Sequence, residues 1–144
     1  MELSTGMNLT RIFLAALAGT VTYFLFGGIL MGAMGGRLKD LYRPHAEVFR
    51  GEDKIMKYFP VGIATMFLCI AVAATFFAQI HPFGADWMAG GKFGVAMGAF
   101  VVFGHVSHNF VTLNIGPKLA VTMAALHFVQ WVLVCVAIAL VYKP

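Results

Sequence analysis

Four long apolar runs constrain the fold of this chain more than any other feature. Residues 12–34, 61–80, 93–115 and 119–142 contain no Asp, Glu, Lys or Arg. Each run is long enough to cross the hydrocarbon core of a bilayer, which takes roughly 20 helical residues. Four helices without a charged face have little surface to turn toward water, which argues against a soluble helical bundle. We therefore expect a polytopic membrane protein.

The runs predict helices and not barrel strands. They are continuously apolar, whereas barrel strands alternate in polarity over segments of roughly 10 residues. Charged residues make up only 11% of the 144 residues, against about 25% in soluble domains. The first run exceeds the apolar core of a cleaved leader, about 7–15 residues, which favours an anchor helix. The predicted fold is all-α, a single domain over residues 1–144 with four transmembrane helices in an antiparallel bundle.

The basic residues between the runs predict the topology. Residues 37–57 hold six Lys and Arg, and Lys118 lies in the third connection, whereas Arg11, Lys92 and Lys143 lie on the opposite side. Because cytoplasmic segments of membrane proteins are enriched in Lys and Arg, we expect a charged cytoplasmic loop at 37–57. Both termini then lie outside, in the periplasm if the membrane is a bacterial inner membrane.

The same loop has two interpretations. Its six basic and four acidic residues favour a solvated loop with snorkelling side chains. The alternative is an interfacial segment that binds anionic lipid or a partner. Nucleic acid is not an expected partner, because the chain has no soluble basic domain to present such a surface.

Glycines recur at a spacing of four in two of the runs. One set is Gly28, Gly32 and Gly36, and another includes Gly94 and Gly98. Such stripes of small residues let helix backbones approach closely. Contact within the bundle is the default use. Self-association or docking to another membrane subunit remains open, because two separate stripes occur in a four-helix protein.

The only concentrated chemistry inside the runs is a set of histidines and amides. His105, His108 and Asn109 lie in the third run, and His127 and Gln130 lie in the fourth. At about 100° per residue, His105 and Asn109 fall on one face together with Gly98, while His108 points away. His127 and Gln130 share a face of the last helix.

A tight turn between the last two runs brings these residues to one depth. Gly116 and Pro117 leave room only for a short connection, so the two helices are antiparallel neighbours. We therefore expect His105, Asn109, His127 and Gln130 to converge within the cytoplasmic half of the bundle.

Four uses of that cluster remain open. The structural one is hydrogen bonding between helices. The others are a pocket for a lipidic ligand, substrate or quinone, a b-type haem ligated by His105 and His127, and a metal site or proton relay that includes His108. No catalytic or nucleotide-binding motif is present in the sequence. No enzymatic activity is therefore expected, and no cofactor is assigned.

Several positions follow a pattern seen in other membrane proteins. Asn8-Leu9 leads into a first helix of small residues that reaches Gly27-Gly28, the third helix carries Gly94 and Gly98 with Asn109 near its end, and a short turn precedes the last helix. This layout resembles a bacterial family of small four-helix membrane proteins of unknown function. The resemblance implies a four-helix fold and brings no activity with it.

The sequence therefore predicts an integral membrane protein of the accessory or scaffold class. It would pack through its Gly-rich helix faces in a homo-oligomer or a larger membrane complex, with the bilayer and itself or another membrane subunit as partners. Two other classes remain open: a small oligomeric transporter or channel, and a haem- or quinone-binding redox component that uses His105 and His127.

Overall fold

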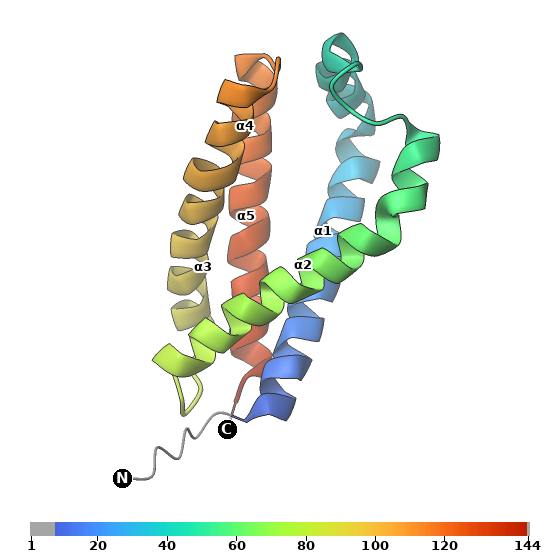
Figure 1. Ribbon diagram of the computed structural model, residues 1–144. Helices are drawn as coiled ribbons and strands as arrows, with labels where there is room; N and C mark the ends of the chain where they lie inside the picture. The colour runs from blue at the N-terminus through green and yellow to red at the C-terminus, as the bar shows by residue number, and fades with distance from the viewer. Residues whose placement is uncertain (1–7, 144) are drawn as a thin grey trace.

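The computed structural model describes residues 8–143, except for the side chains of residues 31, 52 and 53. The described part of the chain is helical and contains no strands (Figure 1). The elements are α1 (Leu9–Tyr42), a 3-10 turn (Arg43–His45), α2 (Glu52–Ile80), α3 (Trp87–Val101), a π-helical segment (Val102–Val106), α4 (Ser107–Thr112) and α5 (Pro117–Val141).

Four helical segments in the described part of the chain are long and apolar enough to cross a membrane. They are Leu9–Leu30, Lys54–Ile80, Trp87–Thr112 and Pro117–Val141. The third is built from α3, the π-helical segment and α4, which run on as one rod (Figure 1). The prediction of an all-helical chain with four helices of membrane length is confirmed.

The predicted extent of the charged loop is wrong. α1 continues to Tyr42 and α2 begins at Glu52, so residues 43–51 connect them instead of 37–57. Lys, Arg and Leu are good helix formers, so a helix that contains them can continue beyond the membrane. Pro44 cannot continue the ladder of helix hydrogen bonds, and it lies in the 3-10 turn that follows α1.

The third helix begins six residues before its predicted start. The side chain of Asp86 accepts a hydrogen bond from the backbone N–H of Ala89 at 2.8 Å, which caps the helix at Trp87. Asn8 does the same for α1 through the N–H of Arg11 at 3.1 Å.

α5 lies between α1 and α3 (Figure 1). α3 and α1 both pack along α5, while α2 packs mainly on α1. α2 crosses the other helices obliquely and bends in its first third, and Pro60 within it breaks the helix ladder. We call the end with the start of α1, the end of α5 and the α2–α3 connection the terminal end, and the end with the α1–α2 and α4–α5 connections the connector end.

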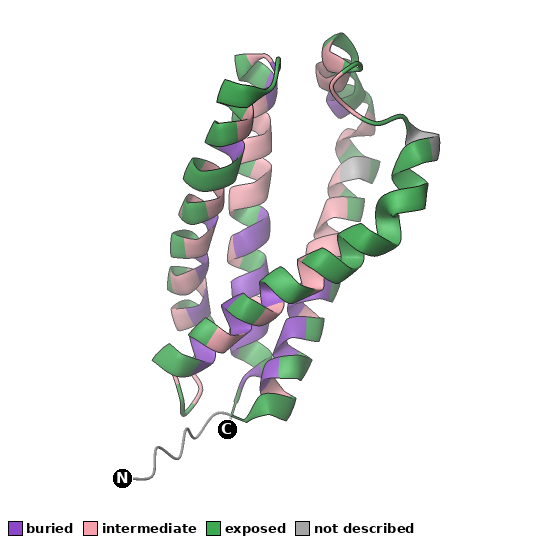
Figure 2. Ribbon diagram, in the orientation of Figure 1, coloured by how far each residue is buried: buried purple, intermediate pink, exposed green. Residues whose placement is uncertain are grey.

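The main hydrophobic core lies in the terminal half of the molecule (Figure 2). It joins the first turns of α1 to the last turns of α2 and α5, and its fully buried members include Ala15, Ile70, Phe77, Val134 and Ile138. Toward the connector end α2 leaves the core, and its apolar side chains are exposed, as at Met56 and Val61. The helices are thus tightly packed at one end and spread at the other.

Candidate functional site

α3 packs on α5 through glycine. A Cβ added at Gly94 would lie 2.7 Å from Cα of Val132, and one at Gly98 would lie 3.1 Å from the carbonyl oxygen of Phe128. Gly90 is equally close to the α5 backbone, with 2.8 Å to the carbonyl oxygen of Cys135. Only glycine permits this approach, since any side chain would force the helices apart. This glycine stripe is therefore used within the chain.

The glycines of α1 divide into two groups. A Cβ at Gly19 would lie 2.8 Å from Cγ2 of Ile70, so this glycine serves the core. Around Gly28, Gly32 and Gly36 the described part of the chain offers no atom within 4 Å of such a Cβ. The default expectation, contact within the bundle, is therefore not met for these three glycines. All three glycines are exposed.

A connected set of polar side chains links α4, α5 and α1. Nδ2 of Asn109 lies 3.1 Å from Nε2 of His105, and the amide donates because its nitrogen is only a donor. The ring of His127 lies close to His105 and to the side chain of Gln130. Nε2 of Gln130 donates to the backbone carbonyl of Tyr23 in α1 at 2.8 Å. The structure thus brings four of the five candidate residues into one set.

The bond from Gln130 to α1 is the most buried part of this set. Gln130 is only 7% exposed, and a Cβ at Gly27 would lie 3.5 Å from its Nε2. Gly27 thus lies beside the amide, and a Cβ there would be at an ordinary van der Waals distance. Interhelical hydrogen bonds in membrane proteins are worth about 0.6 kcal/mol on average and up to about 1.7 kcal/mol. The hydrogen bond of Gln130 to the Tyr23 carbonyl therefore contributes a free energy of this size to the contact between α5 and α1.

His105 does not lie on the face that the ideal helix geometry predicts. We expected His105 and Asn109 beside Gly98, facing the interior. The face that begins with Gly98 continues instead through Val106, which is 2% exposed, whereas His105 is exposed and Asn109 is half-buried. The cluster therefore lies at the margin of the α3–α5 contact and not inside it.

The π-helical segment explains this difference. Between Val102 and Val106 the turns are wider, and Ser107 Oγ donates to the carbonyl oxygen of Val102, five residues back, at 3.0 Å. A π-helical turn inserts about one residue, so every later side chain is rotated relative to an unbroken α-helix. His108 is exposed and takes no part in the connected set among the described residues.

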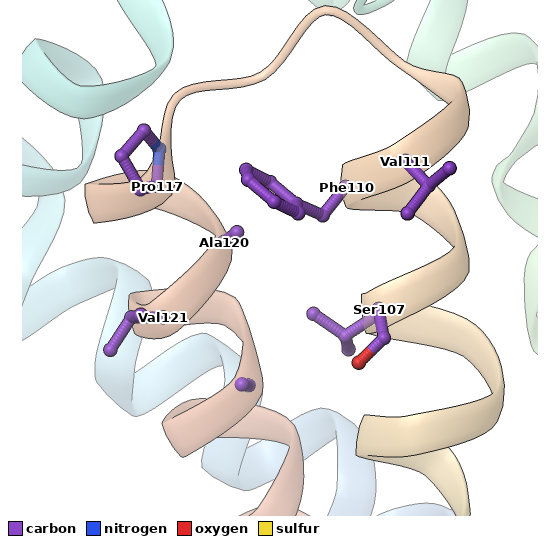
Figure 3. Close-up of a pocket in the computed structure, with 8 residues that line it drawn as sticks. Ser107, Phe110, Val111, Pro117, Ala120 and Val121 are labelled. Atoms are coloured by element: carbon purple, nitrogen blue, oxygen red, sulfur yellow. The ribbon is translucent and has the colours of Figure 1, made fainter.

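An apolar cavity of about 310 Å³ lies between α4 and the start of α5 (Figure 3). Phe110 reaches across from α4 toward α5, and Pro117, Ala120 and Val121 form the opposite wall. The one hydroxyl among its lining residues, Ser107, is already bonded to Val102. Ligand sites usually combine apolar walls with a few polar groups that orient the ligand. None of the connected polar residues lines this cavity, so it offers space without such groups.

The connected set is better suited to hydrogen bonding than to metal or haem ligation. Nε2 of His105 already accepts from Asn109. Among the described side chains, which do not include those of residues 52 and 53, no group of three or more His, Cys, Asp or Glu is placed to hold a metal ion. The arrangement therefore favours polar cross-links between helices, which is the structural one of the four uses left open by the sequence.

A hydrogen bond that the sequence did not predict joins two connections at the connector end. Nε2 of His45, in the 3-10 turn, accepts a hydrogen bond from the backbone N–H of Gly116 at 3.0 Å. This bond joins the α1–α2 connection to the α4–α5 connection across 71 residues of sequence. Leu38, Ile115 and Leu119 are also buried at this end. The only available signal was a histidine next to Pro44, which does not specify a partner.

Comparison of the chain with protein-family models, with curated proteins and with solved structures found no match.

Proposed function

We propose that this protein is a non-catalytic membrane subunit or scaffold that associates through the outward glycine face of α1. This face is formed by Gly28, Gly32 and Gly36. It docks on a helix of a second copy or of another membrane subunit. The four long helices form an antiparallel bundle in the membrane, and the polar set around His105 and Gln130 holds that bundle together.

The unequal use of glycine supports this proposal most strongly. Gly90, Gly94 and Gly98 all meet α5 at distances that exclude a side chain. Gly28, Gly32 and Gly36 have the same spacing but no neighbour within 4 Å in the described chain. Glycine lowers helix stability by roughly 1 kcal/mol relative to alanine. Packing of another helix against these three glycines would explain why glycine, and not a better helix former, occupies the positions.

The exposed apolar side chains beside these glycines fit the same role. Leu25 and Ile29 lie one turn apart next to Gly28 and are 61% and 67% exposed. Together with the glycines they form a flat face flanked by larger side chains, a surface against which a second helix packs closely.

The distribution of basic residues supports a defined orientation in the cell membrane. Seven of the ten Lys and Arg lie toward the connector end, and Arg11, Lys92 and Lys143 lie toward the terminal end. We therefore propose that the connector end faces the cytoplasm and that both termini face the exterior, in bacteria the periplasm of the inner membrane.

A matched pair of substitutions tests the proposed interface. Gly32→Leu places a bulky side chain on the α1 face, while Gly62→Leu places the same side chain on α2, where a Cβ also has no neighbour within 4 Å. Each variant is purified from membranes in mild detergent, and its assembly is measured by native mass spectrometry. We expect Gly32→Leu to shift the protein to a smaller species while its thermal stability is kept.

Gly62→Leu should keep the assembly of the wild-type protein. Loss of a copy of this chain identifies self-association, and loss of a different protein identifies an accessory role. Wild-type assembly in both variants would overturn the proposal.

A further inference from the structure

A histidine of the α1–α2 connection binds the backbone at the start of α5. Nε2 of His45 accepts a hydrogen bond from the N–H of Gly116 at 3.0 Å, and Gly116 is the N-cap residue of α5. A Cβ at Gly116 would lie 3.2 Å from Nε2 of His45, so the ring lies directly against this backbone. The bond is therefore a close contact between two connections that are far apart in the sequence.

The bond requires a neutral imidazole ring. A backbone N–H only donates, so Nε2 of His45 must carry a lone pair, and the proton of the neutral ring is then on Nδ1. In the imidazolium form both ring nitrogens carry protons, and neither can accept. Protonation of His45 and the bond to Gly116 therefore exclude each other. Histidine is the side chain that ordinarily changes its charge between about pH 5 and about pH 8.

The charged groups around His45 determine which way a positive ring moves. His45 shares a cavity of about 290 Å³ with Asp40 of α1 and Lys118 of α5. Arg43 and Glu47 are charged neighbours on its own segment, and both are exposed to solvent. A positive ring is attracted by the Asp40 carboxylate and repelled by the Lys118 ammonium and by the positive N-terminal end of α5. These forces move a protonated ring away from α5 and toward α1.

We propose that the hydrogen bond between His45 and Gly116 is a pH-sensitive clasp at the connector end. With a neutral ring the clasp is closed and holds the α1–α2 connection against the start of α5. Protonation of His45 opens the clasp, so its stabilisation is present at high pH and is lost as the pH falls. If the connector end faces the cytoplasm, the clasp responds to the pH of that compartment. The inference does not depend on the α1 glycine interface.

The amide of Gly116 can be observed selectively by NMR. Ile115 and Gly116 form the only Ile-Gly pair in the sequence, so isotope labelling of the Ile carbonyl carbon and the Gly nitrogen isolates this amide. The full chain in detergent micelles is titrated from about pH 8 to about pH 5. We expect the amide proton signal to move from a bonded to an unbonded position. Its protection against hydrogen exchange, relative to an unstructured peptide at the same pH, should fall about fivefold, as expected for the loss of one hydrogen bond.

Two variants distinguish His45 from other titrating groups. His45→Gln has no charge to gain over this pH range, so its Gly116 signal should not depend on pH. His108→Gln removes an exposed histidine of α4, and its titration should match that of the wild-type protein. A Gly116 signal that does not change with pH in the wild-type protein would overturn the proposal. The same pH dependence in His45→Gln, or its loss in His108→Gln, would also overturn it, because another group would then control the contact.

Discussion

Replacing Gly94 by alanine should separate α3 from α5. The new Cβ would lie 2.7 Å from Cα of Val132 and 3.0 Å from its carbonyl oxygen. These are backbone atoms, so no side-chain rotation relieves the overlap. Restoring an ordinary contact of 3.4 Å needs a displacement of roughly 0.7 Å between the helices. Overpacking of this kind costs about 1–3 kcal/mol.

Gly91→Ala is the control on the same helix. Its Cβ would meet Cγ2 of Val136 at 3.9 Å, an ordinary van der Waals distance. Alanine favours helix over glycine by roughly 1 kcal/mol, so Gly91→Ala should be neutral or stabilising. The free energy of unfolding is measured in detergent for both variants by titration with a denaturing detergent. A Gly94→Ala protein as stable as Gly91→Ala would refute the close packing of α3 on α5.

Three further substitutions test the polar contacts. Gln130→Leu removes the bond to the Tyr23 carbonyl and should lower the free energy of unfolding by about 0.6–1.7 kcal/mol; no change would show that the bond does not tie α5 to α1. His105→Gln should be tolerated better than His105→Leu, because glutamine keeps a hydrogen-bonding group for Asn109; equal thermal stability of the two variants would contradict the structural role. His45→Leu should speed hydrogen exchange at the Gly116 amide about fivefold, since a lost hydrogen bond costs about 1 kcal/mol; unchanged exchange measured by NMR would contradict the contact.

The apolar runs were sufficient to predict four helices of membrane length. In a bilayer the helix must satisfy all its backbone groups, so continuous hydrophobicity alone determines the local structure. The helix ends were not predictable from the same signal. α1 carries Arg37 and Lys39 beyond its apolar run and ends at Tyr42, because charge sets the edge of the membrane and not the end of a helix.

Glycine spacing shows which helix faces permit close packing but not which helix packs there. Gly94 and Gly28 belong to similar stripes, yet only Gly94 meets α5. The difference arises from the oblique course of α2 and the spread of the helices toward the connector end, and neither has a local signal in the sequence.

The sequence predicted which residues belong to the polar cluster better than it predicted how they are arranged. Asn109 bonds to His105, but the π-helical segment turns both away from the face expected for an ideal α-helix. The widened turn includes a bond from Ser107 to the carbonyl oxygen of Val102, and hydrophobic periodicity does not indicate such a turn. The partner of Gln130 is a backbone carbonyl, and every residue supplies one, so side-chain pattern could not select it.

Photocrosslinking in native membranes tests the central claim most directly, that the outward face of α1 is buried against another membrane helix. A photoreactive p-benzoylphenylalanine replaces Ile29, which lies beside the glycines and is 67% exposed within the chain. A second protein carries it at Val61 of α2, which is 59% exposed. The account predicts a crosslinked protein adduct for position 29 and lipid adducts alone for position 61. Lipid adducts alone at position 29 would contradict it.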